Sequence, residues 1–132
     1  MALKRLLDTN AYVAMRRGEA SVTACVRDSE SLVFSLFVVG ELMFGFRNGN
    51  RYQKNVAELE AFLEQPDVTL ALPTWATSDR YGRISAALRK AGTPIPTNDI
   101  WIAAHAFETG AELITLDQHF ECIPGLPVVT LV

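Results

Sequence analysis

The sequence contains few cysteines and no long apolar segment. Only two cysteines, Cys25 and Cys122, occur among its 132 residues, and they form no CxxC pair. This excludes a disulfide-stapled scaffold and a cysteine-based zinc site, and it suits a reducing compartment. The longest apolar run, residues 33–46, contains Glu41 and is shorter than the roughly 20 residues that span a bilayer. We therefore expect a cytoplasmic protein without a membrane segment.

The chain also lacks a strong excess of either charge. It has 12 Lys and Arg residues against 15 Asp and Glu residues, a net charge of -3. Bulk charge therefore does not mark a nucleic-acid-binding protein. Hydrophobic residues make up 49% of the chain and charged residues 20%, a composition that excludes a disordered polymer. The length fits one domain of about 100–150 residues.

Strand-like apolar runs alternate with helical patterns along the chain. The predicted strands are residues 3–7, 32–34, 68–72, 113–116 and 128–131. The predicted helices are residues 11–17, 20–27, 36–46, a segment after Asn50, a segment ending near residue 90, and 99–109. This alternation predicts an α/β fold, with a mainly parallel sheet covered by helices on both faces.

Polar residues and glycines at the ends of these segments predict where the helices begin and stop. The predicted N-caps are Ser35, Asn50 and either Thr97 or Asn98, and Gly92 and Gly110 are the predicted helix stops. In parallel sheets of this kind, ligands bind beyond the carboxyl ends of the strands. Functional residues are therefore expected at that edge.

Four acidic residues occupy unusual positions. Asp8 and Asp117 directly follow predicted strands, Glu41 lies in an apolar helix, and Asp99 opens another helix. Taken singly, the aspartates are explained by turns or by the helix dipole. Glu41 is harder to explain, because a glutamate buried among apolar neighbours without a partner costs several kcal/mol.

A common site explains the four acids together. On a parallel sheet they can converge at one edge, where their mutual repulsion requires a cation. Oxygen ligands of this type select Mg²⁺ or Mn²⁺. Such an ion can activate water and stabilise the charge of an in-line phosphoryl displacement.

The ordered set of motifs resembles the PIN-domain ribonucleases of the VapC toxin family, over nearly the whole chain. The motifs that carry the resemblance are LLDTN at 6–10, Ser35 with Glu41-Leu42 and Gly45, GTPI at 92–95, NDIWIAAHA at 98–106, LITLDQHF at 113–120 and IPGL at 123–126. The resemblance implies a single three-layer α/β/α PIN-like domain over residues 1–132.

The resemblance also implies an activity and its residues. Asp8, Glu41, Asp99 and Asp117 match the acidic catalytic site of the family, with Asp8 and Asp99 as the principal metal ligands. Thr9 and Thr115 match positions that orient carboxylates by hydrogen bonds. The implied activity is Mg²⁺-dependent cleavage of RNA, with Mn²⁺ as a substitute.

The implied biology is that of a toxin held inactive by a cognate antitoxin. Family members are typically homodimers, so a homodimer is expected. Further basic residues, among them Arg16, Arg17, Arg51 and Lys54, are candidates for phosphate contacts, although ordinary solvated faces also explain them.

Two other classes fit the sequence less well. An aspartyl-phosphate phosphatase needs a second aspartate where Asn10 stands, and a phospho-receiver domain needs an acid after the third strand, where Leu72-Pro73 stands. A non-catalytic PIN-like module that binds RNA or protein is the main alternative to the enzyme. Metal dependence of RNA cleavage separates the two.

Histidines and aromatic residues are expected to be mainly structural. His105 is predicted to be a packed, hydrogen-bonded histidine, and His119 a surface-loop histidine. Core or dimer-interface positions are predicted for Trp75, Trp101 and Phe120. A core position for Phe44 is as plausible as a place beside an antitoxin-binding groove.

Overall fold

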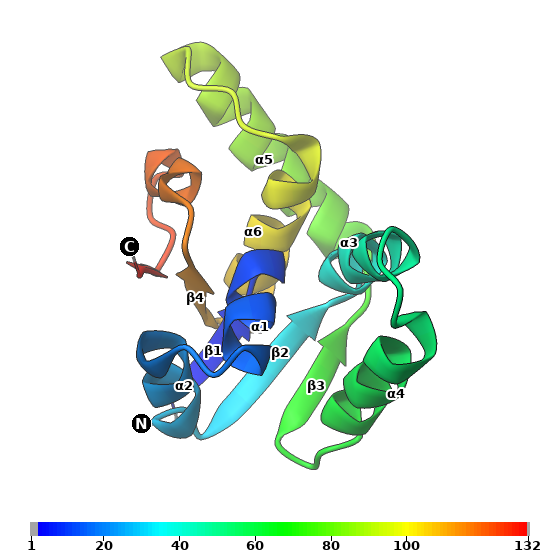
Figure 1. Cartoon of the computed structure of the whole chain (residues 1–132). Coiled ribbons are helices and arrows are strands. Elements are labelled where there is room, and N and C mark those ends of the chain that lie inside the picture. The colour runs from blue at the N-terminus through cyan, green and yellow to red at the C-terminus, as the bar shows by residue number, and fades with distance from the viewer. Residues whose placement is uncertain (1–2, 132) are drawn as a thin grey trace.

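The computed structural model describes residues 3–131, and in this part of the chain five strands form one parallel sheet (Figure 1). The sheet order is β3-β2-β1-β4-β5, and every neighbouring pair is parallel. The strands are β1 (Lys4–Leu7), β2 (Ser31–Ser35), β3 (Val68–Ala71), β4 (Glu112–Thr115) and β5 (Val128–Thr130). The predicted α/β fold with a parallel sheet is confirmed, and β1 lies at its centre.

Helices cover both faces of this sheet. They are α1 (Thr9–Arg16), α2 (Ala20–Arg27), α3 (Leu36–Arg47), α4 (Tyr52–Leu63), α5 (Trp75–Ala91), α6 (Thr97–Thr109) and the short 3-10 helix η1 (Gln118–Cys122). α2 packs on α1, α5 packs on α6, and α3 contacts both α1 and α6. None of the described helices is long and apolar enough to cross a membrane.

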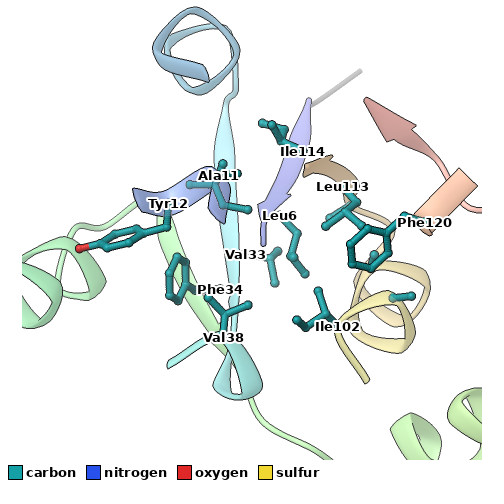
Figure 2. Close-up of a cluster of buried hydrophobic side chains, with 14 of the residues drawn as sticks. Leu6, Ala11, Tyr12, Val33, Phe34, Val38, Ile102, Leu113, Ile114 and Phe120 are labelled. Atoms are coloured by element: carbon teal, nitrogen blue, oxygen red, sulfur yellow. The ribbon is translucent and has the colours of Figure 1, made fainter. Parts of the chain in front are cut away.

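The central strands bury apolar side chains toward α6. Leu6 pairs in register with Val33 on one side and with Leu113 on the other, so the three side chains share one face of the sheet. All three are buried, and Figure 2 shows Leu6 and Val33 pointing toward Ile102 of α6. These contacts fix α6, which carries Asp99 at its start, against the middle of the sheet.

The opposite face packs against α1 and α4 through an aromatic cluster. Tyr12 of α1, Phe34 of β2 and Phe62 of α4 meet edge to face, with ring centroids 5.3 to 5.5 Å apart. Such pairs add about 0.5–1.5 kcal/mol beyond the burial of their area. They anchor α1 beside the end of β1, where Asp8 lies.

The predicted helix ends are partly correct. The Ser35 hydroxyl caps α3 by accepting a hydrogen bond from the Phe37 amide at 3.2 Å. Gly92 ends α5 and Gly110 ends α6, each with a left-handed backbone at φ 73° and 72°, which glycine adopts without steric cost.

Two predicted N-caps are wrong. The first helical hydrogen bond of α4 is accepted by the Arg51 carbonyl, and that of α6 by the Pro96 carbonyl. Each helix therefore begins at a different residue from the one that the polar side chains suggested. Asn50 lies before the cap of α4, whereas Thr97 and Asn98 are already helical.

Phe120 is buried as expected. Trp75 is 89% exposed and Phe44 is 70% exposed, so neither belongs to the core, and a dimer-interface position for Trp75 stays a prediction. Trp75 opens α5 beyond the sheet, and Phe44 lies away from the face of α3 that buries Val38 and Leu42.

Candidate active site

Asp8 lies at the carboxyl end of β1 and caps α1. Its side chain is buried, with Oδ1 accepting a hydrogen bond from the Ala11 amide at 2.8 Å and Oδ2 accepting one from the Thr115 hydroxyl. Burial raises the pKa of Asp8, although the two hydrogen bonds oppose this shift. The carboxylate is therefore held in one orientation by neighbours on both sides.

Asp117 follows β4, the strand next to β1. Its backbone amide donates to the Thr115 hydroxyl oxygen at 2.9 Å, so one threonine touches both aspartates. Asp117 also caps η1, because Oδ1 accepts from the His119 amide at 2.9 Å. Its Oδ2 lies 2.8 Å from His119 Nδ1.

Glu41 is the acid supplied by α3. It is half-buried, and its Oε1 accepts a hydrogen bond of 2.6 Å from the hydroxyl of Thr9. Thr9 follows Asp8 directly in the chain and opens α1. This bond brings Glu41 to the side of Asp8 and explains how a glutamate is accommodated on an apolar helix.

Asp99 lies in the first turn of α6 and is half-buried. Its pKa is raised to about 6, first by burial and then by the negative charges of Glu41, Asp117 and Asp8. The charge of His119 acts in the opposite direction. The mutual repulsion shows that the four acids share one electrostatic environment.

The structure therefore brings all four sequence-predicted acids together at the carboxyl edge of the sheet. Within residues 3–131, no salt bridge joins Asp8, Glu41 or Asp99 to a lysine or arginine. Unneutralised carboxylates at such close quarters are unfavourable unless a cation binds. Their oxygen donors fit a divalent ion such as Mg²⁺ or Mn²⁺.

An open, shallow depression lies beside Asp117. Its lining includes Asn10, Asp117, His119 and Cys122, and its volume is about 890 Å³. Asp117 and His119 are both reachable from solvent, with side-chain exposures of 34% and 55%. A polymer can therefore reach Asp117 and His119 from this side.

The two histidines differ in their surroundings. His105 is fully buried and hydrogen-bonded to Ser35 at 2.8 Å, as predicted, and burial lowers its pKa. His119 is exposed as predicted, but its contact with Asp117 places it in the acidic cluster. The signal that could have revealed this is its position two residues after a strand-end aspartate.

Known proteins resemble this chain over nearly its whole length. The PIN-domain family model matches residues 5–126. Ribonuclease VapC2 of Haemophilus influenzae is 34% identical over 127 residues, which cover 94% of this chain and 95% of the relative. The tRNA(fMet)-specific endonuclease VapC of Salmonella typhimurium is 30% identical over 129 residues, which cover 96% of each chain.

A solved structure extends the likeness to three dimensions. VapBC-1 from nontypeable Haemophilus influenzae is similar with a TM-score of 0.84 and 28% identity, over 97% of this chain and 98% of the solved one. The family match, the identities and the common fold cover almost the same residues. The chain therefore belongs to the PIN-domain family, among its VapC ribonucleases.

Proposed function

We propose that this chain is a divalent-metal-dependent endoribonuclease that acts as the toxin of a type II toxin–antitoxin pair, with residues 1–132 as its single PIN-like domain. The convergence of Asp8, Glu41, Asp99 and Asp117, three of them without a basic partner in the described structure, carries the proposal. The names of its relatives, ribonuclease VapC2 and tRNA(fMet)-specific endonuclease VapC, support the same activity.

Asp8 and Asp99 are the proposed principal ligands of Mg²⁺, with Mn²⁺ as a substitute. PIN-domain nucleases depend on a divalent metal, and the all-carboxylate set favours a hard ion. Glu41 and Asp117 complete the site directly or through water. Thr9 and Thr115 hold Glu41 and Asp8 by hydrogen bonds, so the carboxylates need little rearrangement when the ion binds.

The proposed reaction is in-line attack of water on an RNA phosphodiester. When bound, the ion supplies electrostatic stabilisation of the phosphoryl charge and activation of water. The chain itself orients the ligands through Thr9, Thr115 and the Ala11 amide. The expected products carry 5′-phosphate and 3′-hydroxyl ends. The protein is expected to act in the cytoplasm, in keeping with two cysteines that form no disulfide.

Cleavage assays test the proposal directly. Purified protein is incubated with total RNA and with initiator tRNA, chosen because of the name of the Salmonella relative. We expect cleavage with Mg²⁺ and none with EDTA. Asp8→Asn and Asp99→Asn should lower the rate by at least about 100-fold while the proteins remain folded.

Glu60→Gln is the matched control, because Glu60 is an exposed acid of α4 outside the cluster. Its rate should equal that of the unchanged protein. RNA binding without cleavage, unaffected by Asp8→Asn, would instead support the non-catalytic module. Sequencing of the RNA ends after induction would identify the target.

A cognate antitoxin is the proposed protein partner, and a homodimer the proposed assembly. The solved relative is VapBC-1, and VapBC is a family of toxin–antitoxin systems. Expression of this chain alone should arrest growth, and the antitoxin encoded beside it should restore growth. Normal growth in the presence of abundant folded protein would contradict the toxin role.

A further inference from the structure

One nitrogen donor lies within the acidic cluster. One potential ligand atom from each of Asp99, Asp117 and His119 lies within 4.8 Å of the other two. His119 Nδ1 is 2.8 Å from Asp117 Oδ2. The imidazole of His119 therefore adds a nitrogen donor to a site in which the four acids offer only oxygen donors.

The position of this imidazole is set by the backbone. His119 belongs to η1, and its amide is bound to Asp117 Oδ1 at 2.9 Å. The Asp117 amide is bound in turn to Thr115, the last residue of β4. Phe120, the next residue, is buried and anchors the turn in the core. The ring is thus held beside Asp117 while its side chain stays 55% exposed.

The spacing of the donors suits one shared ion. Adjacent ligands of a six-coordinate ion with bonds of about 2.1 Å lie about 3 Å apart. The 2.8 Å separation of His119 Nδ1 and Asp117 Oδ2 is close to that value. Without an ion, a hydrogen bond between the same two atoms holds the ring in place. Binding requires Nδ1 to be unprotonated, with the ring proton on Nε2.

We propose that His119 Nδ1 is a ligand, together with Asp117 and Asp99, of a divalent cation, and that it makes the site prefer Mn²⁺ to Mg²⁺. The proposal rests on the metal-dependent function above: it adds His119 to the proposed ligands of the same ion, and it makes Mn²⁺ rather than Mg²⁺ the ion that binds more tightly. Mg²⁺ strongly prefers oxygen donors, whereas first-row transition ions also accept imidazole nitrogen. A single nitrogen ligand therefore strengthens Mn²⁺ binding far more than Mg²⁺ binding.

Electron paramagnetic resonance of Mn²⁺ tests this without RNA. The six-line signal of free Mn²⁺ gives its dissociation constant, and spin-echo modulation detects a directly bound ¹⁴N nucleus. The unchanged protein should show ¹⁴N coupling. His119→Ala should abolish the coupling and weaken Mn²⁺ binding by about tenfold or more, with less than about threefold change for Mg²⁺ measured calorimetrically.

Gln118→Ala is the matched control, because Gln118 is exposed in the same turn. It should retain both the coupling and the affinity. Absence of ¹⁴N coupling in the unchanged protein, or equal weakening of both ions by His119→Ala, would overturn the proposal and leave His119 as an orienting partner of Asp117.

A parallel RNA cleavage assay separates this proposal from the proposed function. Cleavage by a protein whose bound Mn²⁺ shows no ¹⁴N coupling overturns the ligand assignment alone. Coupling in a protein that cleaves no RNA supports the ligand assignment and overturns the nuclease.

Discussion

The hydroxyl of Thr115 donates a hydrogen bond to Asp8 Oδ2 across 107 residues of sequence. The same hydroxyl accepts a hydrogen bond from the Asp117 amide. β1 and β4 are neighbours in the sheet, with Leu7 paired to Ile114. One threonine at this edge therefore sets the positions of two acids that come from opposite ends of the chain.

Thr115→Val should impair the site without unfolding the protein. Valine has the shape of threonine but cannot donate to Asp8 or accept from Asp117. We expect divalent-ion affinity and RNA cleavage to fall by about 10–100-fold, as for other partners that orient metal ligands. Calorimetric titration and a cleavage assay measure the two effects.

Thr130→Val is the control for this substitution, because the buried Thr130 hydroxyl has no hydrogen-bond partner among the described residues. It should leave both measurements unchanged. Full activity in Thr115→Val would show that Asp8 needs no such support.

The raised pKa of Asp99 predicts a pH-dependent stability of the metal-free protein. The pKa rises from 3.8 to about 6 on folding, so between these values the folded state binds more protons than the unfolded chain. Asp99 therefore stabilises the folded state at low pH relative to high pH. This contribution to the free energy of unfolding is lost as the pH rises through about 6.

The Asp99→Asn variant does not lose stability in this way, because asparagine does not ionise. In EDTA at about pH 7.5 the variant should be more stable by on the order of 1 kcal/mol, a figure reduced for solvent screening of a half-buried group. Near pH 4 the difference should vanish. Urea unfolding at both pH values measures it, and a gain that is independent of pH would argue against charge repulsion as its cause.

Ser35→Ala should destabilise the fold through two lost interactions. The Ser35 hydroxyl caps α3 and contacts buried His105 Nδ1 at 2.8 Å. Loss of the cap and of the hydrogen bond to the buried His105 Nδ1 should lower the free energy of unfolding by about 2–4 kcal/mol. Urea denaturation measures this, with the exposed Ser21→Ala as a control that should change little. A loss below about 0.5 kcal/mol would contradict the account.

Phe34→Ala should cost more, because Phe34 is fully buried between Tyr12 and Phe62. Truncation of a buried phenylalanine costs about 3–5 kcal/mol. Phe44→Ala, at a 70% exposed position, should change stability by less than about 0.5 kcal/mol. Thermal unfolding of the two variants compares them, and equal losses would contradict the assignment of Phe44 to the surface.

Much of the fold was predictable because local patterns and tertiary packing agree. The helix predicted at 20–27 matches α2 without error, and Ser35 caps α3 as expected. The predicted helix starts are wrong where the residue at the N-cap position has no side chain that can cap the helix. Arg51 and Pro96 occupy those positions, and neither carries the short polar group that marks an N-cap.

The site was only partly predictable. The positions of Asp8 and Asp117 after strands indicated one edge of the sheet, but the contact between Thr9 and Glu41 depends on how α1 packs against α3. The 3-10 turn that brings His119 back to Asp117 has no hydrophobic period of its own. Residues fixed by packing between distant elements leave no local signal in the sequence.

The long separation between Asp8 and Thr115 has a consequence for synthesis of the protein. A ribosome releases the chain from its N-terminus, so the first aspartate emerges long before β4 exists. The Asp8–Thr115 contact and the full set of carboxylates assemble only after β4 and Asp117 have been translated. A nascent polypeptide that has not yet been extended through β4 thus lacks a completed acidic centre, because Thr115 and Asp117 are still missing.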